Sequence, residues 1–275
     1  MIISASRRTD IPAFYSSWFM ECIREGRVVV KNPFRPSQAK TVSLLPEDVD
    51  AIVFWTRNAN PLLPALRELD QRGFHYIFLY TITGYGPPLE PQAPSSEAAV
   101  HVFKRLSRTI GPHRVMWRFD PIIFVEGKGE KWILTRFESI ARSLKNQTST
   151  VIVSFLDYYR KVERRLKRLE ETEAVKTIDI STRKEVVARI SHRLVETAHE
   201  NGMEICSCAE TIDLEPYGIR PGSCINGNYL NNLFGLTIRA DKDKSQRPEC
   251  RCTTSQDIGE YNTCRYGCLY CYAIR

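Results

Sequence analysis

Short apolar segments alternate along most of this chain with longer segments whose apolar residues recur at helical spacing. This alternation is typical of βα units joined into a parallel sheet. The apolar segments are unbroken, as expected of strands that are buried on both faces. The predicted strands are residues 2–6, 51–56, 76–82, 114–119, 150–155 and 203–208.

The alternation stops after the sixth predicted strand. From about residue 213 the sequence is rich in Gly, Pro, Asn and Cys, which is typical of an irregular region held together by metal. A chain of 275 residues is long enough for one large core. We therefore expect an α/β fold, a partial (β/α)6 TIM-type barrel with parallel strands over residues 1–212. We expect residues 213–275 to form a cysteine-rich tail folded over the barrel mouth.

Charge and hydropathy narrow the class of protein only a little. The chain has 39 basic and 32 acidic residues, a mild excess that suits anionic ligands, including nucleotides and nucleic acid, without identifying one. Its N-terminal apolar run is too short for a signal peptide, and no segment approaches the length of a membrane span. We expect a cytoplasmic protein with no membrane partner.

The cysteines are concentrated near the end of the sequence. Eight of the nine lie at or beyond residue 206. Because cytosolic thiols stay reduced, this concentration indicates metal rather than disulfides. Three of them, Cys264, Cys268 and Cys271, fall within eight residues. Thiolates bind iron or zinc, and a site with three protein ligands leaves one metal position open for a small molecule.

The run Cys264-Arg-Tyr-Gly-Cys268-Leu-Tyr-Cys271-Tyr272 resembles the cysteine motif of the radical S-adenosylmethionine superfamily, especially its spore photoproduct lyase-like members. The resemblance implies that these cysteines hold a 4Fe–4S cluster. S-adenosyl-L-methionine would chelate the fourth iron, Tyr270 would contact its adenine, and a flavodoxin or ferredoxin would donate electrons. The superfamily places this motif after the first strand, so the tail must here fold back to the barrel mouth.

The whole chain is also similar to an uncharacterised bacterial family, the domain of unknown function numbered 1848. This similarity rests on residues 6–12, 54–58, 118–121 and 257–273. It covers nearly the entire chain and implies no particular reaction.

A second set of cysteines has enough ligands for another cluster. We expect the ligands to be Cys208, Cys224, Cys250 and Cys252, with Cys206 as the alternative to Cys208 because both lie on one face of a predicted strand. A structural zinc site is the alternative to iron and sulfur, since zinc accepts the same thiolates.

Polar residues follow the predicted strands, where the functional groups of parallel βα barrels gather. The candidate catalytic residues are Arg8, Asp10, Arg57, Arg118 and Asp120. Together they suit a charged substrate, such as a small molecule or nucleotide, although buried ion pairs would explain the same residues.

These observations favour a radical S-adenosylmethionine enzyme with one 4Fe–4S cluster and a second one beside it. One alternative is an iron–sulfur electron-transfer or sensor protein. Another is a zinc-stabilised barrel that binds nucleic acid. The basic segment 160–168, next to Tyr158 and Tyr159, is compatible with base stacking and phosphate contact, but is also typical of a solvated helix face.

Overall fold

The protein is described by a computed structural model of residues 1–33, 35 and 37–274. Its centre is a parallel sheet of eight strands in the order β11-β10-β8-β6-β5-β4-β1-β12. The strands are β1 (Ile2–Ala5), β4 (Ala51–Thr56), β5 (Tyr76–Thr81), β6 (Val115–Ile122), β8 (Thr150–Phe155), β10 (Glu204–Cys208), β11 (Arg220–Gly222) and β12 (Gln256–Asp257).

All six predicted strands are confirmed, and consecutive ones lie side by side, as is usual for successive βα units. The α/β class is therefore confirmed. No pairing joins β11 to β12 in the part of the chain that the structure describes, so the sheet is open. The expectation that residues beyond 213 are irregular is wrong in part. They supply both edge strands and a helix with an Asn226 N-cap and a C-terminal Gly235.

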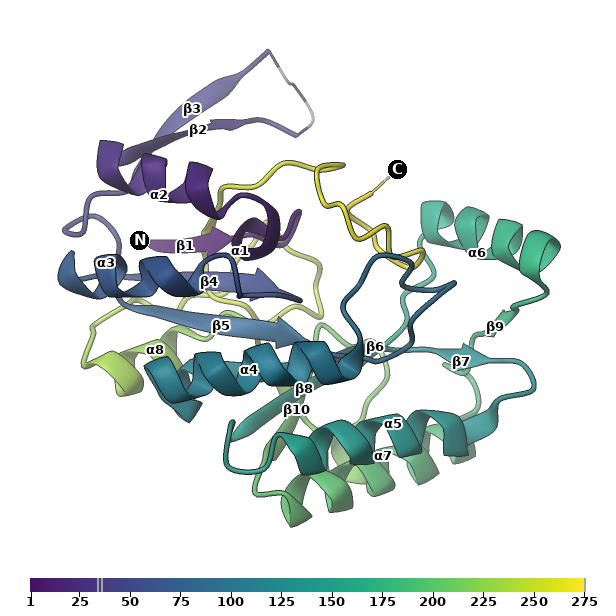
Figure 1. The fold of residues 1–275 in the computed structure, drawn as a ribbon. Helices are drawn as coiled ribbons and strands as arrows, with labels where there is room; N and C mark the ends of the chain where they lie inside the picture. Colours follow the sequence, from purple (N-terminus) through teal and green to yellow (C-terminus); the bar gives the residue numbers. More distant parts are fainter. Residues whose placement is uncertain (34, 36, 275) are drawn as a thin grey trace.

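The helices are α1 (Ile11–Phe14), α2 (Ser16–Glu25), α3 (Leu66–Gln71), α4 (Ser96–Ile110), α5 (Gly129–Ser143), α6 (Arg160–Glu173), α7 (Lys184–Glu200) and α8 (Gly227–Phe234). All of these except α6 and α8 cover one face of the sheet (Figure 1). Helix α6 lies beside the C-terminal tail, and α8 lies behind the sheet. No helix among the described residues is long and apolar enough to cross a membrane.

Strand residues alternate between two apolar clusters, because successive side chains point to opposite faces. Ile52 and Phe54 pack toward the helices, while Val53 packs against Ile225 and Leu230 of the tail. The tail segment from 224 to 252 therefore covers the second face of the sheet.

Small elements complete the fold. The antiparallel strands β2 (Arg27–Lys31) and β3 (Ala39–Ser43) form a hairpin outside the sheet. A second antiparallel pair joins β7 (Phe124–Val125) to β9 (Thr177–Ile178). Short 3-10 turns lie at Leu63–Ala65, Pro112–Arg114 and Glu215–Tyr217.

Candidate active site

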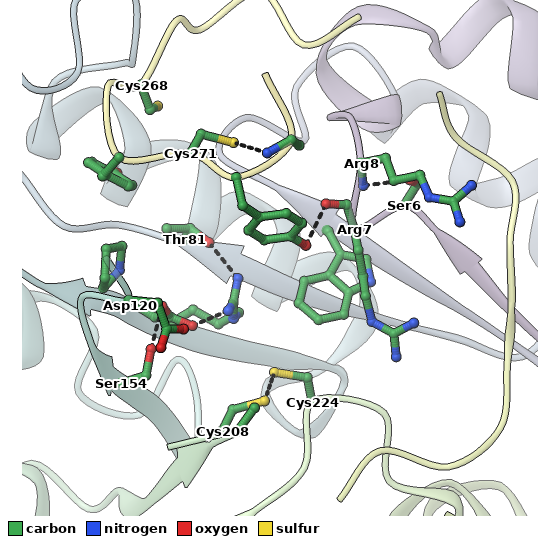
Figure 2. A pocket seen from close by; sticks show the side chains of 18 of the residues that line it. Ser6, Arg7, Arg8, Thr81, Asp120, Ser154, Cys208, Cys224, Cys268 and Cys271 are labelled. Carbon is green, nitrogen blue, oxygen red and sulfur yellow. Dashed lines mark hydrogen bonds and ion pairs between the residues drawn. The ribbon is translucent and has the colours of Figure 1, made fainter. Parts of the chain in front are cut away.

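A cavity of about 490 Å³ opens at the carboxyl ends of the strands. Every candidate catalytic residue predicted from the strand ends lines it, namely Arg8, Asp10, Arg57, Arg118 and Asp120. Seven cysteines line it too: Cys208, Cys224, Cys250, Cys252, Cys264, Cys268 and Cys271. Figure 2 shows Cys268 and Cys271 on one side, with Cys208 and Cys224 across from them. One cavity thus joins the two predicted cysteine sets.

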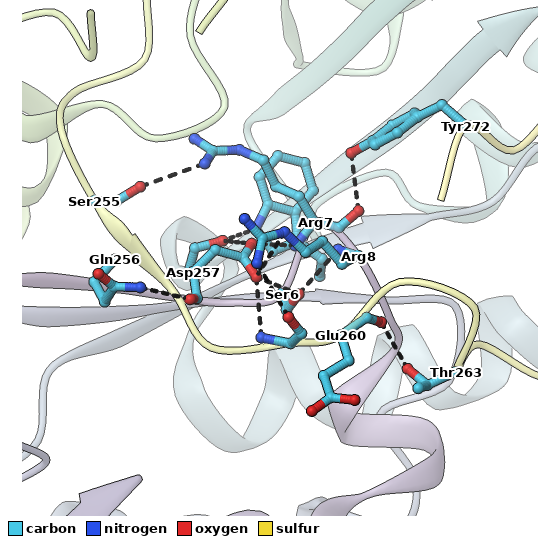
Figure 3. Close-up of polar contacts among 12 residues, drawn as sticks. Ser6, Arg7, Arg8, Ser255, Gln256, Asp257, Glu260, Thr263 and Tyr272 are labelled. Carbon is cyan, nitrogen blue, oxygen red and sulfur yellow. Dashed lines mark hydrogen bonds and ion pairs between the residues drawn. The ribbon is translucent and has the colours of Figure 1, made fainter. Parts of the chain in front are cut away.

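The tail folds back to the first βα loop, as the radical-enzyme resemblance requires. The Tyr15 hydroxyl donates to the carbonyl of Thr263 at 2.7 Å. The Tyr272 hydroxyl donates to the carbonyl of Arg7 at 2.8 Å (Figure 3). The backbone N–H of Leu269 donates to the carbonyl of Leu89 at 3.0 Å. The motif therefore lies between the first loop and the loop after β5.

A single side chain of α6 fixes the backbone of the motif. The Arg165 guanidinium donates to the carbonyls of Leu269 at 2.9 Å, Ile274 at 2.8 Å and Cys271. Because a guanidinium is a rigid fork of donors, these bonds hold the loop in one shape. The exposed basic face predicted for this helix thus includes one residue with a structural role.

A buried ion pair lies beneath the motif. The Arg57 guanidinium is 2.9 Å from the carboxylate of Glu90, and the Tyr270 hydroxyl bonds both groups. Burial by itself would raise the pKa of Glu90, but the charge of Arg57 lowers it below its ordinary value. Tyr270, expected to contact adenine, lines the cavity with its hydroxyl already engaged in this network.

Asp10 lies next to the motif and has a different environment. It caps α1 and accepts hydrogen bonds from the N–H of Ala13 at 2.9 Å, the Thr56 hydroxyl at 2.8 Å and the N–H of Arg57 at 2.7 Å. Burial raises the pKa of Asp10 to about 7, against the effect of these bonds. A carboxyl group with such a pKa is suited to proton transfer near neutral pH.

The tail cysteines suit an anionic cluster. The backbone N–H of Ala273 points at the sulfur of Cys271 at 3.3 Å, and such bonds stabilise thiolate ligands. Burial raises the pKa of Cys268 to about 12, while the positive charge of Arg57 opposes that rise. A metal ion would supply the further positive charge that a buried thiolate needs.

The second set comes from three separate places in the fold. Cys208 ends β10, Cys224 follows β11, and Cys250 and Cys252 lie in the loop before β12. The sulfurs of Cys208 and Cys224 are 2.8 Å apart. Hydrogen bonds from Cys208, Cys224 and Cys250 lower the pKa of Cys252. All four predicted ligands therefore lie together.

Cys206 is placed differently from these four. It does not line the cavity and packs against Gly222 of the neighbouring strand, where a Cβ would come within 2.7 Å of its sulfur. Burial raises the pKa of Cys206 to about 11, and no other cysteine contributes to that shift. The geometry thus favours Cys208 over Cys206.

Two guanidiniums flank the second set. Arg7 lies beside Cys252, and Arg118 beside Cys208 and Cys224. Buried N–H groups of both, Nη2 of Arg7 and Nε of Arg118, have no hydrogen-bond partner among the described residues. Such donors are costly to bury, and thiolate sulfurs would satisfy them. These donors fit an anionic metal–thiolate centre.

The described residues contain no group of three or more His, Cys, Asp and Glu side chains arranged to hold a single metal ion. The thiolates of an iron–sulfur cluster bind different iron atoms, so they need not meet at one point.

The model of the family described as Domain of unknown function (DUF1848) matches residues 2–273. The chain belongs to this family. No curated protein and no solved structure matches the chain.

The cavity is surrounded by the segments on which the similarity to the DUF1848 family rests. Its lining includes residues 6–10, 55–57, 118, 120 and 121, and about half of 257–273. Sequence reasoning gave Asp257 no role, yet its carboxylate accepts hydrogen bonds from Ser4 at 3.0 Å, Ser6 at 2.7 Å and the N–H of Arg7 at 2.8 Å (Figure 3). Asp257 thereby fastens the tail to β1.

The alternative of buried ion pairs holds for part of the predicted DUF1848 site. Arg118 pairs with Asp120, which also accepts a hydrogen bond from Ser154 at 2.7 Å. Arg57 pairs with Glu90 rather than with a predicted residue. The Arg8 guanidinium lies 3.9 Å from Asp257 and donates to the carbonyl of Gly259 at 3.3 Å.

Sequence reasoning missed Glu90. It lies in a Pro-rich loop, Pro87-Pro88-Leu89-Glu90-Pro91, and is only 2% exposed. A carboxylate that deeply buried is rare without a partner, but burial within a loop has no sequence periodicity by which to recognise it.

Proposed function

We propose that this protein is a radical S-adenosylmethionine-type enzyme whose substrate enters the cavity. One observation carries the proposal: the motif of Cys264, Cys268 and Cys271 lies beside the first βα loop, at the carboxyl ends of the strands, although it comes late in the sequence. There a metal position left open by three ligands would face the cavity.

Cys264, Cys268 and Cys271 would hold a 4Fe–4S cluster with S-adenosyl-L-methionine at the open iron. When bound, this pair supplies a 5'-deoxyadenosyl radical that abstracts hydrogen from the substrate. The chain's own residues would bind and orient the substrate and exclude water from the cavity. Arg8, with its guanidinium at the cavity wall, suits a carboxylate or phosphate of the ligand, and Asp10 can hold or release a proton.

Cys208, Cys224, Cys250 and Cys252 would hold the second iron–sulfur cluster. Arg7 and Arg118 would offset its negative charge. We extend the proposal to the fold, as a partial (β/α)6 TIM-type barrel, and to a cytoplasmic setting in which a flavodoxin or ferredoxin donates the electron.

The test is direct. Anaerobically reconstituted protein receives dithionite and S-adenosyl-L-methionine, and 5'-deoxyadenosine is measured by chromatography. We expect it to form, and the electron paramagnetic resonance of the reduced cluster to change when S-adenosyl-L-methionine binds. An intact cluster that yields neither result would identify an electron-transfer or sensor protein instead.

Metal analysis separates the remaining alternative. If anaerobically purified protein contained stoichiometric zinc and no acid-labile sulfide, both iron–sulfur clusters would be ruled out and the protein would be a zinc-stabilised barrel. Cys22→Ala is the matched control for any cysteine substitution, because Cys22 lies on α2, packs against the apolar core and does not line the cavity.

A further inference from the structure

Three exposed tyrosines lie at the cavity. Tyr159, Tyr261 and Tyr272 are 43%, 37% and 40% exposed, and each lines it. Isolated exposed aromatic rings are ordinary, but three around one cavity form a patch. We call these residues the tyrosine rim.

The rim gathers at the N-terminus of α6. Tyr159 is the residue that precedes this helix, and its ring centroid lies 6.3 Å from that of Tyr272. Tyr261 lies under two cations, with Lys161 Nζ 5.7 Å and the Arg8 guanidinium 5.1 Å from its ring centroid. Tyr158, which the sequence paired with Tyr159, is instead part of the apolar cluster beneath the tail.

The surroundings of the rim are cationic. Five basic residues of α6 form no ion pair with any described residue: Arg160, Lys161, Arg164, Lys167 and Arg168. Of the acids near the rim, Asp157 pairs with Arg247 at 2.6 Å and Glu260 pairs with Lys31 at 3.1 Å. Glu163 in the first turn of α6 and Glu249 near Tyr159 offset only part of the positive charge. The N-terminus of α6 adds its positive dipole end.

We propose that the tyrosine rim binds a nucleobase, with the adjoining phosphate held by the basic residues of α6. The substrate class would be a nucleotide, free or within a single-stranded nucleic acid. Aromatic rings stack on any base, and a basic surface beside them tracks the phosphates. This inference rests on the proposed function and names the substrate class for the same cavity.

Binding is measured by fluorescence anisotropy with a labelled single-stranded oligothymidylate and the reconstituted full-length protein, without S-adenosyl-L-methionine. Unlabelled thymidine monophosphate and unlabelled oligonucleotide compete in separate arms. Competition by both at similar concentrations identifies a free nucleotide as sufficient, and competition by the oligonucleotide alone identifies the strand.

Tyr159→Ala and Tyr261→Ala should each weaken binding about 5- to 100-fold, as expected for the loss of base stacking. Tyr159→Phe and Tyr261→Phe keep the ring and should keep the affinity, which guards against a folding defect. Replacing Lys161 and Arg164 by Gln should lower the salt dependence of binding. The matched control is Trp18→Ala, an equally exposed ring on α2 outside the cavity lining.

The inference would be overturned if the labelled oligonucleotide did not bind and neither unlabelled competitor bound. It would also be overturned if Tyr159→Ala and Trp18→Ala lowered the affinity equally. The two proposals fail separately. Binding that depends on the rim without formation of 5'-deoxyadenosine removes the radical chemistry alone, while 5'-deoxyadenosine formation without such binding removes the nucleotide assignment alone.

Discussion

The two cysteine sites of this molecule are assembled in opposite ways. The tail site comes from eight consecutive residues, 264–271, and other elements hold it through Arg165 and the Arg57–Glu90 pair. The second site draws its four ligands from three places between Cys208 and Cys252 and lies against the apolar face of the sheet. Local spacing thus defines the first site, and the tertiary fold defines the second.

Their charge environments differ as well. Near the tail site, Arg57 is already balanced by Glu90. Beside the second site, buried N–H groups of Arg7 and Arg118 have no partner within the described residues. Although Arg118 also pairs with Asp120, the second site is the one whose described surroundings keep unsatisfied guanidinium N–H groups that an anion would accept.

The sharpest test breaks one site at a time. Cys268→Ala should abolish formation of 5'-deoxyadenosine, and Cys252→Ala should remove the second cluster, each lowering iron and sulfide by roughly half. Iron and sulfide analysis with visible absorption measures both. The two-site description would be wrong if either substitution emptied both sites.

Glu90→Ala should damage the tail site selectively. It leaves the Arg57 guanidinium buried without its counter-ion, and such loss lowers the free energy of unfolding by about 3–5 kcal/mol. Urea denaturation measures the change. Glu68→Ala is the control, because Glu68 forms solvent-exposed pairs with Arg24 and Arg72 and its loss should shift the midpoint little. Equal effects of the two substitutions would contradict the role of Glu90.

Arg118→Met should act on the second site. Removal of a positive charge beside Cys208 and Cys224 disfavours the reduced, more negative cluster by roughly 1–4 kcal/mol, so its potential becomes more negative. A redox titration followed by electron paramagnetic resonance measures both clusters. Arg189→Met, at an exposed pair with Glu130, is the control. A matching shift at the tail site would show that Arg118 does not discriminate between the sites.

Cys206→Ala should have the smallest effect. Loss of one partly buried sulfur lowers the free energy of unfolding by about 1 kcal/mol and leaves the metal content unchanged. Cys208→Ala, two residues away on the same strand, should lose the second cluster. If the Cys206 variant lost metal and the Cys208 variant kept it, Cys206 would be the ligand in place of Cys208.

The sheet was predictable because its strands are buried on both faces and therefore read as unbroken apolar runs, as at Ala51–Thr56. The edge strands β11 and β12 were not, since three and two residues are too short to show a periodicity. Open sheet and closed barrel share the same alternation, so closure has no local pattern either.

The residues of the candidate site also fall into those that a local sequence pattern predicts and those that only the tertiary fold brings together. Spacing alone identified Cys264, Cys268 and Cys271, and strand ends identified Arg118 and Asp120, which do line the cavity. The partners Glu90 and Asp257 lie in loops, where only the tertiary fold brings a carboxylate to a distant arginine or serine.

The pairing of β12 with β1 has a consequence for biosynthesis. Asp257 pairs in register with Ser4, so the earliest strand to leave the ribosome meets its outer neighbour only after more than 250 further residues have been made. Until then the inner strands can already pair, and all four cysteines of the second site have been made, but the tail site still lacks Cys264, Cys268 and Cys271. Metal insertion at the tail site should therefore follow synthesis of the sheet rather than accompany it, and a nascent chain stalled before Asp257 should fold its centre without a tail cluster.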